Sequence, residues 1–230
     1  MFKDHRKNIQ NEILNYSYLG LMSSKIRIGI IGGQRGGYIK AKRFVSNRSY
    51  VEVLAKEFCY DIIKLCEDNP EELKLIKDEF NYKFLEDKHI IIIALQNEEA
   101  INKIINYCEE HSKIYINSSN FKEGMGVVPK SIKSKNLSGC VNTIYGNPKG
   151  AVMISKKLED IFHDYDDFIS LTTMIRNKCK NLKNKDEVFK LIYSEEFKEC
   201  VKDGKAHDYL KENLGKETLE YIMSKAYENK

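Results

Sequence analysis

Apolar and polar positions follow two distinct patterns along the first half of the chain. Ile26–Ile31 and His89–Leu95 are almost continuous apolar runs, which are typical of strands buried on both faces of a sheet. Tyr50–Ala55 alternates at period two, and this pattern also predicts a strand. The full prediction is strands at Ile26–Ile31, Tyr50–Ala55, Tyr82–Phe84, His89–Leu95 and Lys113–Asn117, with helices at Gly37–Ser46, Asp61–Asp68 and Glu98–Glu110.

This alternation of strands and helices predicts a parallel, doubly wound α/β sheet. Such sheets bind their ligands at the carboxyl ends of the strands. Gly32, Asn97 and Asn117 each stand at or just after the end of a predicted strand. We therefore expect these three residues to line one edge of the sheet.

The second half of the chain has a different pattern. Phe121–Asn136 is polar and basic, and beyond Pro148 the spacing of apolar residues predicts helices and no strand. Proline suits the first turn of a helix, so Pro148 marks the start of the helical region. We predict two helices, Lys149–Phe162 and Asp166–Leu182, with the acidic run His163–Asp167 breaking the first and capping the second.

The turn that follows the first predicted strand is rich in glycine. It reads Gly32-Gly33-Gln34-Arg35-Gly36-Gly37, against an ideal dinucleotide fingerprint of G-x-G-x-x-G. Glycines at such a turn let the backbone approach a pyrophosphate, whose charge is favoured by the helix N-terminus. Gln34 stands where the second glycine belongs, so the turn by itself leaves cofactor binding and a purely structural role both open.

The amino-acid composition limits which class of protein this is and which partners we expect it to bind. The hydrophobic content of 42% and the charged content of 31% are globular values, and the net charge of +4 is dispersed, so we expect no nucleic-acid partner. The first 15 residues lack a signal-peptide apolar core and no apolar run approaches a membrane helix, so we expect a cytoplasmic protein without a membrane partner. The histidines are scattered and no C-x-x-C occurs, so we predict no metal site.

Four segments then occur in a recognisable order. They are IGIIGGQRGGYIKAKRF with its Lys40-Ala41 pair, IIIIALQNEEAINKII with Asn102, IYINSSNF, and VNTIYGNPKGAVMISKKLEDI. In this order the chain resembles the siroheme synthase family, the precorrin-2 dehydrogenase and sirohydrochlorin ferrochelatase module, from Ile26 to Leu210. The resemblance implies NAD-dependent oxidation of precorrin-2 to sirohydrochlorin in a homodimer, and some members also insert ferrous iron into the tetrapyrrole.

The resemblance also implies an organisation and a set of site residues. We expect a Rossmann-like parallel-sheet domain that binds NAD at 1–119, a dimerisation arm at 120–148 and a helical C-terminal domain at 149–230. Asn97 is expected near the ribose on the nicotinamide side and Asn117 near the nicotinamide itself. The residues expected around the pyrophosphate are Gly32, Gly33, Gln34, Arg35, Gly36 and Gly37.

Two positions next to the expected tetrapyrrole substrate differ from the family. Asn120 occupies the position of a catalytic aspartate, and an amide cannot accept a proton at neutral pH. Thr143 stands where the family often has a serine, which keeps a hydroxyl. If a protein group removes the substrate proton, Glu123 and His111 are the candidates, and solvent is the third.

The two changes at Gln34 and Asn120 leave the function open between three alternatives. The first is a divergent dehydrogenase. The second is a catalytically degenerate module that binds a tetrapyrrole or a nucleotide, and the third is a chelatase alone. Incubation with precorrin-2 and NAD separates the first two alternatives, and sirohydrochlorin with ferrous iron tests the third.

Overall fold

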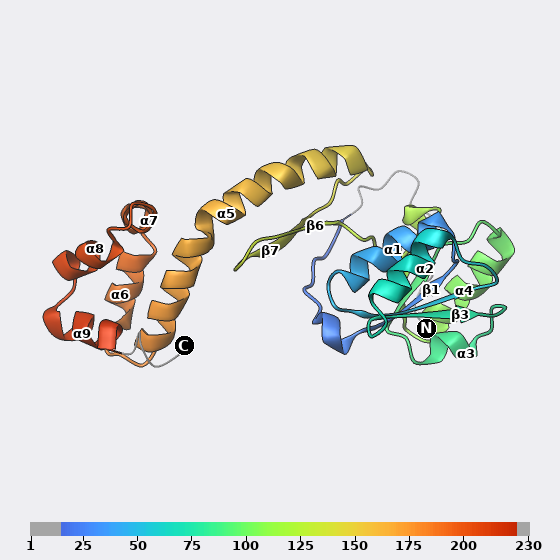
Figure 1. The fold of residues 1–230 in the computed structure, drawn as a ribbon, viewed down its shortest axis with the longest axis horizontal. Helices are drawn as coiled ribbons and strands as arrows, with labels where there is room; N and C mark the ends of the chain where they lie inside the picture. The colour runs from blue at the N-terminus through green and yellow to red at the C-terminus, as the bar shows by residue number, and fades with distance from the viewer. Residues whose placement is uncertain (1–14, 225–230) are drawn as a thin grey trace. The chain divides into compact units, whose positions relative to one another are not determined.

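The computed structural model describes residues 15–224. Contacts divide the chain into two compact units, with the boundary between Val128 and Pro129 (Figure 1). The three-part division at 119/120 and 148/149 stays a prediction. Among the described residues, none of the helices combines the length and the apolar content that a membrane span requires. The first 14 residues, on which the expectation about a signal peptide depended, lie outside the described range.

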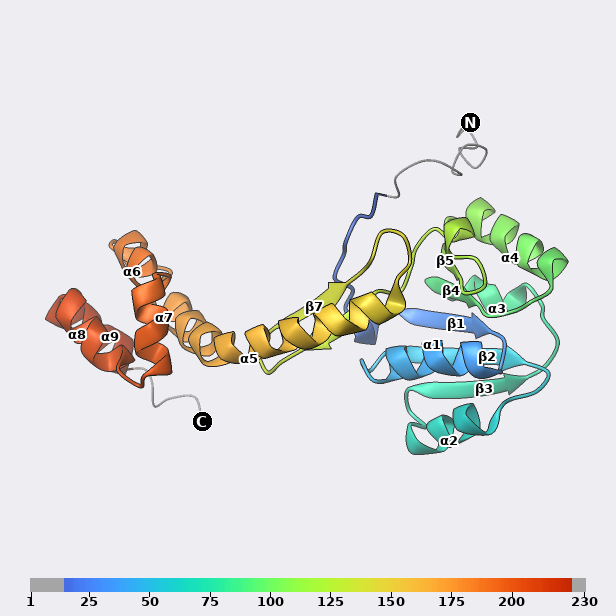
Figure 2. The same ribbon diagram turned by 90° about the horizontal axis from the view of Figure 1, so that it is seen from above.

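The first unit contains a five-stranded parallel sheet with helices on both faces, and this confirms the predicted fold class (Figure 2). The strand order is β3-β2-β1-β4-β5. The chain therefore crosses from one end of the sheet back to the middle after β3. The strands are β1 (Arg27–Ile31), β2 (Tyr50–Ala55), β3 (Leu73–Lys77), β4 (Ile90–Ile93) and β5 (Ile114–Asn117). The helical segments are η2 (Ser23–Lys25), α1 (Arg35–Val45), α2 (Tyr60–Asp68), α3 (Lys83–Glu86), α4 (Glu98–Glu110) and η3 (Phe121–Glu123).

Successive residues of each central strand point to opposite faces, so the sheet separates two apolar layers. Ile30 of β1 packs in the layer that contains Ala41 of α1 and Ile62 of α2. Ile31, the next residue, packs in the layer that contains Leu85 of α3 and Ile104 of α4. The continuous apolar runs seen in the sequence follow from this burial on both faces, which is usual in parallel sheets.

One predicted strand was wrong, and one real strand was missed. Tyr82–Phe84 is not a strand, because Lys83–Glu86 forms the short helix α3. The side chain of Asn81 accepts a hydrogen bond from the backbone N–H of Phe84 at 3.2 Å, a local bond that favours a turn over an extended chain. The missed strand is β3 (Leu73–Lys77), whose apolar pattern is interrupted by lysines because it lies at the end of the sheet.

The second unit begins with an antiparallel hairpin and continues as helices through the rest of the described chain. Pro148 occupies the first turn of the long helix, as predicted, and the Asn147 side chain accepts from Gly150 N at 2.9 Å. The elements are β6 (Lys130–Lys133), β7 (Ser138–Val141), α5 (Pro148–Cys179), α6 (Lys185–Ile192), α7 (Glu195–Lys202), α8 (Ala206–Asn213) and α9 (Lys216–Ser224).

The predicted break at His163–Asp167 was wrong, because Pro148–Cys179 is one continuous helix. Asp166 caps the turn of the β6–β7 hairpin instead of a helix. Its carboxylate accepts from the hydroxyl of Ser134 at 2.8 Å and from the backbone N–H of Asn136 at 2.8 Å. An acidic side chain that looked like a helix breaker therefore satisfies polar groups about 30 residues away in the sequence.

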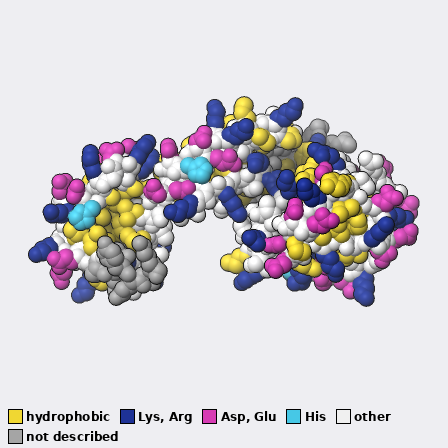
Figure 3. Space-filling model, viewed as in Figure 1, with side chains coloured by type: hydrophobic (Ala, Val, Ile, Leu, Met, Phe, Trp, Pro, Cys, Tyr) yellow, Lys and Arg dark blue, Asp and Glu magenta, His cyan; other side chains and the backbone are white. Residues whose placement is uncertain are grey.

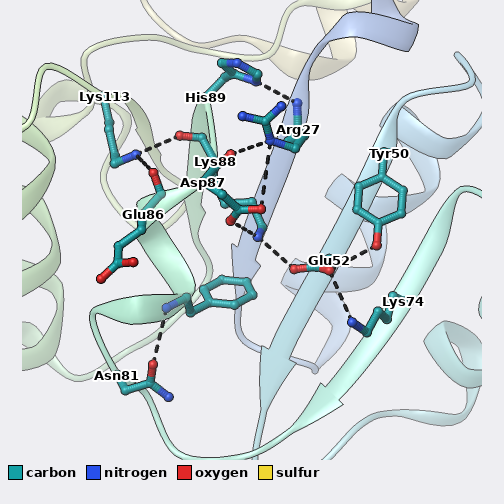
Figure 4. A network of polar contacts seen from close by, with 11 residues as sticks. Arg27, Tyr50, Glu52, Lys74, Asn81, Glu86, Asp87, Lys88, His89 and Lys113 are labelled. Atoms are coloured by element: carbon teal, nitrogen blue, oxygen red, sulfur yellow. Dashed lines mark hydrogen bonds and ion pairs between the residues drawn. The ribbon is translucent and has the colours of Figure 1, made fainter.

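A buried ion pair crosses the amino-terminal half of the sheet in the first unit (Figure 4). Lys88 precedes β4, and its side chain is only 3% exposed; its Nζ lies 2.7 Å from Oε2 of Glu52 on β2. It passes over Gly29 of β1, where an added Cβ would lie 3.1 Å from Cγ of Lys88. Tyr50 and Lys74 also reach the Glu52 carboxylate. Glycine in the middle of β1 thus leaves the space in which this pair forms.

The pair controls the ionisation of Glu52. Burial is the largest single influence and raises the pKa of this carboxyl, but the hydrogen bond and charge of Lys88, with smaller effects of Tyr50 and Lys74, together hold the pKa below its usual value. A lowered pKa in the folded state means that the interaction stabilises the fold above the pKa of the unfolded chain. This stabilisation is lost as the pH falls through the folded pKa.

We predict that Lys88→Met destabilises the fold by about 3 kcal/mol at neutral pH, because it leaves a buried carboxylate without its cation. The pKa of Glu52 in the folded variant should rise, because Lys88 no longer opposes the effect of burial, so the stability lost relative to the wild type should shrink as the pH falls and Glu52 is protonated. Urea unfolding over a pH series measures both effects. Lys74→Met is the matched control, because the Lys74 side chain is 60% exposed at 3.5 Å from the same carboxylate, and it should cost under about 1 kcal/mol. Equal losses in the two variants would contradict this account.

Candidate functional site

The carboxyl ends of three strands meet at one edge of the sheet. The backbone N–H of Ala94, after β4, donates to Ile31 O at 2.9 Å, and the N–H of Ser118, after β5, donates to Ile93 O at 2.9 Å. These bonds place the turns after β1, β4 and β5 side by side. Gly32, Asn97 and Asn117 therefore line the same edge, as the order of strands and helices in the sequence predicts.

Three glycines of the turn are required by close packing. Gly32 has a φ of +121°, and an added Cβ would lie 2.3 Å from Ala94 O. A Cβ on Gly37 would lie 1.9 Å from Gly32 O, and one on Gly33 would lie 2.4 Å from Glu57 O. All three distances are far shorter than a carbon can tolerate. The turn therefore holds the start of α1 directly against the ends of β1 and β4.

The other residues of the turn face solvent. A Cβ on Gly36 would meet only Ala94 Cβ at 3.7 Å, which is an ordinary contact. Gln34 is exposed at the N-cap of α1, and its side chain makes no capping hydrogen bond. The guanidinium of Arg35 is exposed and lies 3.7 Å from Asp61. The first N–H groups of a helix have no intrahelical partner, so this end of α1 offers donors and positive potential to an anion.

A polar pocket of about 320 Å³ opens on the β4–β5 side of the same edge. The carboxylate of Glu123 in this pocket accepts from the side-chain amides of Asn117 at 3.0 Å and Asn120 at 2.8 Å. Asn102, singled out in the sequence, also lines it. The lining residues are Gln96, Glu98, Ile101, Asn102, Asn117, Ser119, Asn120 and Glu123.

Asn97, Thr143 and His111 are not among the residues that line this pocket. Asn97 caps α4, because its side chain accepts from Ala100 N at 2.8 Å. Thr143 belongs to the second unit, where its hydroxyl accepts from Asn147 N at 2.6 Å just before α5. His111 follows the C-terminus of α4, which begins at the carboxyl edge and runs back to the other edge. The expectation that His111 approaches the site was wrong, because a helix of that length carries it about 20 Å away.

Sequence reasoning missed three polar residues that line the pocket. Gln96 lies in the turn between β4 and α4, and Glu98 begins α4. Ser119 lies after β5, and its hydroxyl donates to Leu95 O at 2.6 Å, which joins the two turns. Their position just beyond strand ends was the available signal, since this is where parallel sheets place ligand-binding groups.

Figure 3 shows that positive and negative side chains are interspersed on the visible face of each unit. The polar pocket offers amide and carboxylate groups to a small molecule.

Comparisons with known proteins agree with this geometry. Residues 19–130 match a family described as "Putative NAD(P)-binding". A curated protein of Methanocaldococcus jannaschii, named "Putative precorrin-2 dehydrogenase", is 26% identical over 188 residues, which cover 76% of this chain and 89% of that protein. A solved structure titled "SirC, precorrin-2 dehydrogenase" has the same fold, with a TM-score of 0.65 at 17% identity over 86% of this chain and 98% of that one. The solved structure shares the fold, and the curated relative bears the name of the activity that the resemblance to the siroheme synthase family implies.

The matched region and the curated relative support a nicotinamide cofactor. The glycine turn fits such a group. Gly32, Gly33 and Gly37 bring the backbone close to the strand ends, and the space beside Gly36 is open. The Gln34 side chain is exposed and makes no capping bond, so it can move aside without losing a contact of that kind.

We predict that Gly37→Ala destabilises the first unit by about 2 kcal/mol, because the added methyl group overlaps the carbonyl oxygen of Gly32. Gly36→Ala is the control, since its methyl group has room and alanine favours a helix over glycine by up to about 1 kcal/mol. Thermal unfolding followed by circular dichroism compares them. A loss of stability of similar size in Gly36→Ala would show that the close approach is not the cause.

Proposed function

We propose that this chain oxidises precorrin-2 to sirohydrochlorin with NAD as the hydride acceptor. The observation that carries the proposal is the position of the glycine turn and the polar pocket on the two sides of the carboxyl end of β4. A dinucleotide binds across the carboxyl edge of a parallel sheet at the point where the strand order reverses, with its two halves on either side of that point. In this sheet the order reverses between β1 and β4. The name of the Methanocaldococcus relative supports the substrate.

The residues of the edge have distinct roles in this proposal. Gly32, Gly33, Gly36 and Gly37 allow the pyrophosphate to approach the backbone, and Gln34 and Arg35 flank it. Asn97 would lie near the ribose on the nicotinamide side, and Asn117 near the nicotinamide. When bound, the nicotinamide supplies the acceptor for hydride.

The substrate would lie over the pocket on the β4–β5 side. Precorrin-2 carries a fringe of carboxylates, and Lys122 is exposed on the same turn as Asn120 and Glu123. A positive charge at that position favours an anionic macrocycle. The amide of Asn120 can orient the macrocycle by hydrogen bonds.

We predict that the purified protein converts the absorption spectrum of precorrin-2 to that of sirohydrochlorin when NAD is added. Parallel reactions with NADP, and with sirohydrochlorin and ferrous iron, test cofactor choice and iron insertion. Absence of conversion with either nucleotide, together with saturable binding of the tetrapyrrole, would replace the dehydrogenase with a binding module. Iron insertion without oxidation would leave a chelatase alone.

We also propose that the protein is a homodimer. Five large apolar side chains are exposed over a short stretch that ends in the first turns of α5. They are Ile144, Tyr145, Val152, Met153 and Ile154, which are 46%, 80%, 43%, 60% and 41% exposed. Apolar clusters of this kind are common in protein–protein interfaces. A second copy of the chain is the partner that the family resemblance implies.

We predict that Met153→Glu shifts the protein from dimer to monomer, because it places a charge in the exposed apolar stretch. Size-exclusion chromatography with light scattering measures the mass. Lys156→Glu, also exposed on α5, is the control and should remain dimeric. A wild-type chain of monomer mass, or a dimeric Met153→Glu variant, would refute this interface.

A further inference from the structure

Glu123 is held in the pocket by uncharged donors. Each oxygen of its carboxylate accepts one side-chain amide hydrogen bond, at 2.8 Å from Asn120 and at 3.0 Å from Asn117. A carboxylate oxygen has two acceptor sites, so each oxygen keeps one for another donor. The Glu123 side chain is also exposed, so a ligand in the pocket can reach it.

The direction of these hydrogen bonds follows from the backbone. Oδ1 of Asn117 accepts from the N–H groups of Ser119 at 3.0 Å and Asn120 at 3.2 Å. Oδ1 of Asn120 accepts from the N–H of Lys122 at 3.3 Å. Backbone N–H groups can only donate, so the oxygen of each amide faces the backbone and the NH₂ group faces Glu123. The two asparagines are therefore built to receive a carboxylate.

The turn that carries Glu123 is tied to the sheet. The backbone N–H of Met125 donates to Tyr115 O on β5 at 3.0 Å. A Cβ on Gly124 would lie 3.0 Å from the backbone N of Asn117, so the chain passes close to the end of β5 directly after Glu123. Asn117 is itself 1% exposed. The carboxylate is thus presented from a fixed base and not from a free loop.

The other groups near the pocket are less suited to accept a proton. Asn120 is an amide and has no basic atom at neutral pH. Glu98 lines the pocket, but in the part of the chain that the structure describes no side-chain hydrogen bond orients its carboxylate. Glu123 is an exposed carboxylate that two amides orient beside the carboxyl end of β5.

From this geometry we propose that Glu123 is the catalytic carboxylate that accepts the substrate proton. The inference rests on the proposed function and deepens it. In the oxidation of precorrin-2 a carbon–hydrogen bond breaks and its hydride passes to the nicotinamide of NAD. A proton leaves a neighbouring ring carbon or pyrrole nitrogen, and Glu123 accepts it and later releases it to water. The substrate loses two electrons and two hydrogens, and NAD gains the electron pair with one of these hydrogens.

The amide at position 120 is part of the same arrangement. An aspartate there would place a second negative charge about 3 Å from the Glu123 carboxylate, and two carboxylates at that distance do not both ionise readily. An amide replaces this repulsion with a hydrogen bond. Positions 120 and 123 therefore suit one carboxylate and one amide. Exchanging these two groups should keep the hydrogen bond between the two side chains.

We expect Glu123→Gln to lower kcat for precorrin-2 oxidation by about 100-fold, the usual scale for loss of a general base. Tetrapyrrole affinity, from an absorption titration without nucleotide, should change little because the side chain keeps its size. Glu110→Gln, at the C-terminal end of α4, is the matched control and should keep the wild-type rate. Circular dichroism melting curves establish that each variant folds.

The double variant Asn120→Asp with Glu123→Gln provides the second test. It moves the carboxylate from position 123 to position 120 and puts an amide in its former place, so that a carboxylate and an amide remain side by side. It should recover at least about tenfold of the rate lost in Glu123→Gln, since residues in one hydrogen-bonded pair couple strongly. A Glu123→Gln variant as fast as Glu110→Gln would refute the role of Glu123 and leave dehydrogenation intact, with solvent taking the proton. A wild-type chain without turnover would refute the proposed function and this inference together.

Discussion

The contact between the glycine turn and the end of β4 is the constraint on which the candidate site depends. Side chains are excluded at Gly32 and Gly37 because the carbonyl oxygens of Ala94 and Gly32 occupy that space. The start of α1 is therefore held against two neighbouring strands, and β1 and β4 become the centre of the sheet. This position directs the N-terminus of α1 and the turn after β4 to the same edge.

The first unit uses two buried or ordered carboxylates in opposite ways. Glu52 lies in the amino-terminal half of the sheet, and the cation of Lys88 neutralises it in a space left by Gly29. Glu123 lies at the carboxyl edge, and neutral amides orient it without cancelling its charge. The first arrangement contributes to stability because removal of either partner leaves a buried charge. The second keeps a charged, exposed oxygen available to a ligand, which is what proton transfer requires.

In the second unit, long-range polar contacts join the hairpin to the long helix. Asp166, in the middle of α5, accepts hydrogen bonds from three residues of the hairpin turn. Ile132 of β6 is buried, and a Cβ on Gly139 of β7 would lie 3.0 Å from the ring of Phe162. The hairpin and the first half of α5 therefore form one packed element within this unit.

The sequence by itself determined the elements whose signal is local. The period of apolar residues identified Tyr50–Ala55 and Glu98–Glu110 with the bounds that the structure has, and the glycines after β1 marked the turn at the sheet edge. Only the tertiary structure decided the elements that depend on distant partners. The strand β3 and the unbroken α5 are stabilised by neighbours that the local sequence does not reveal. The same holds for the Asn117, Asn120 and Glu123 cluster, because the direction of each amide depends on which backbone N–H groups the folded turn presents to it.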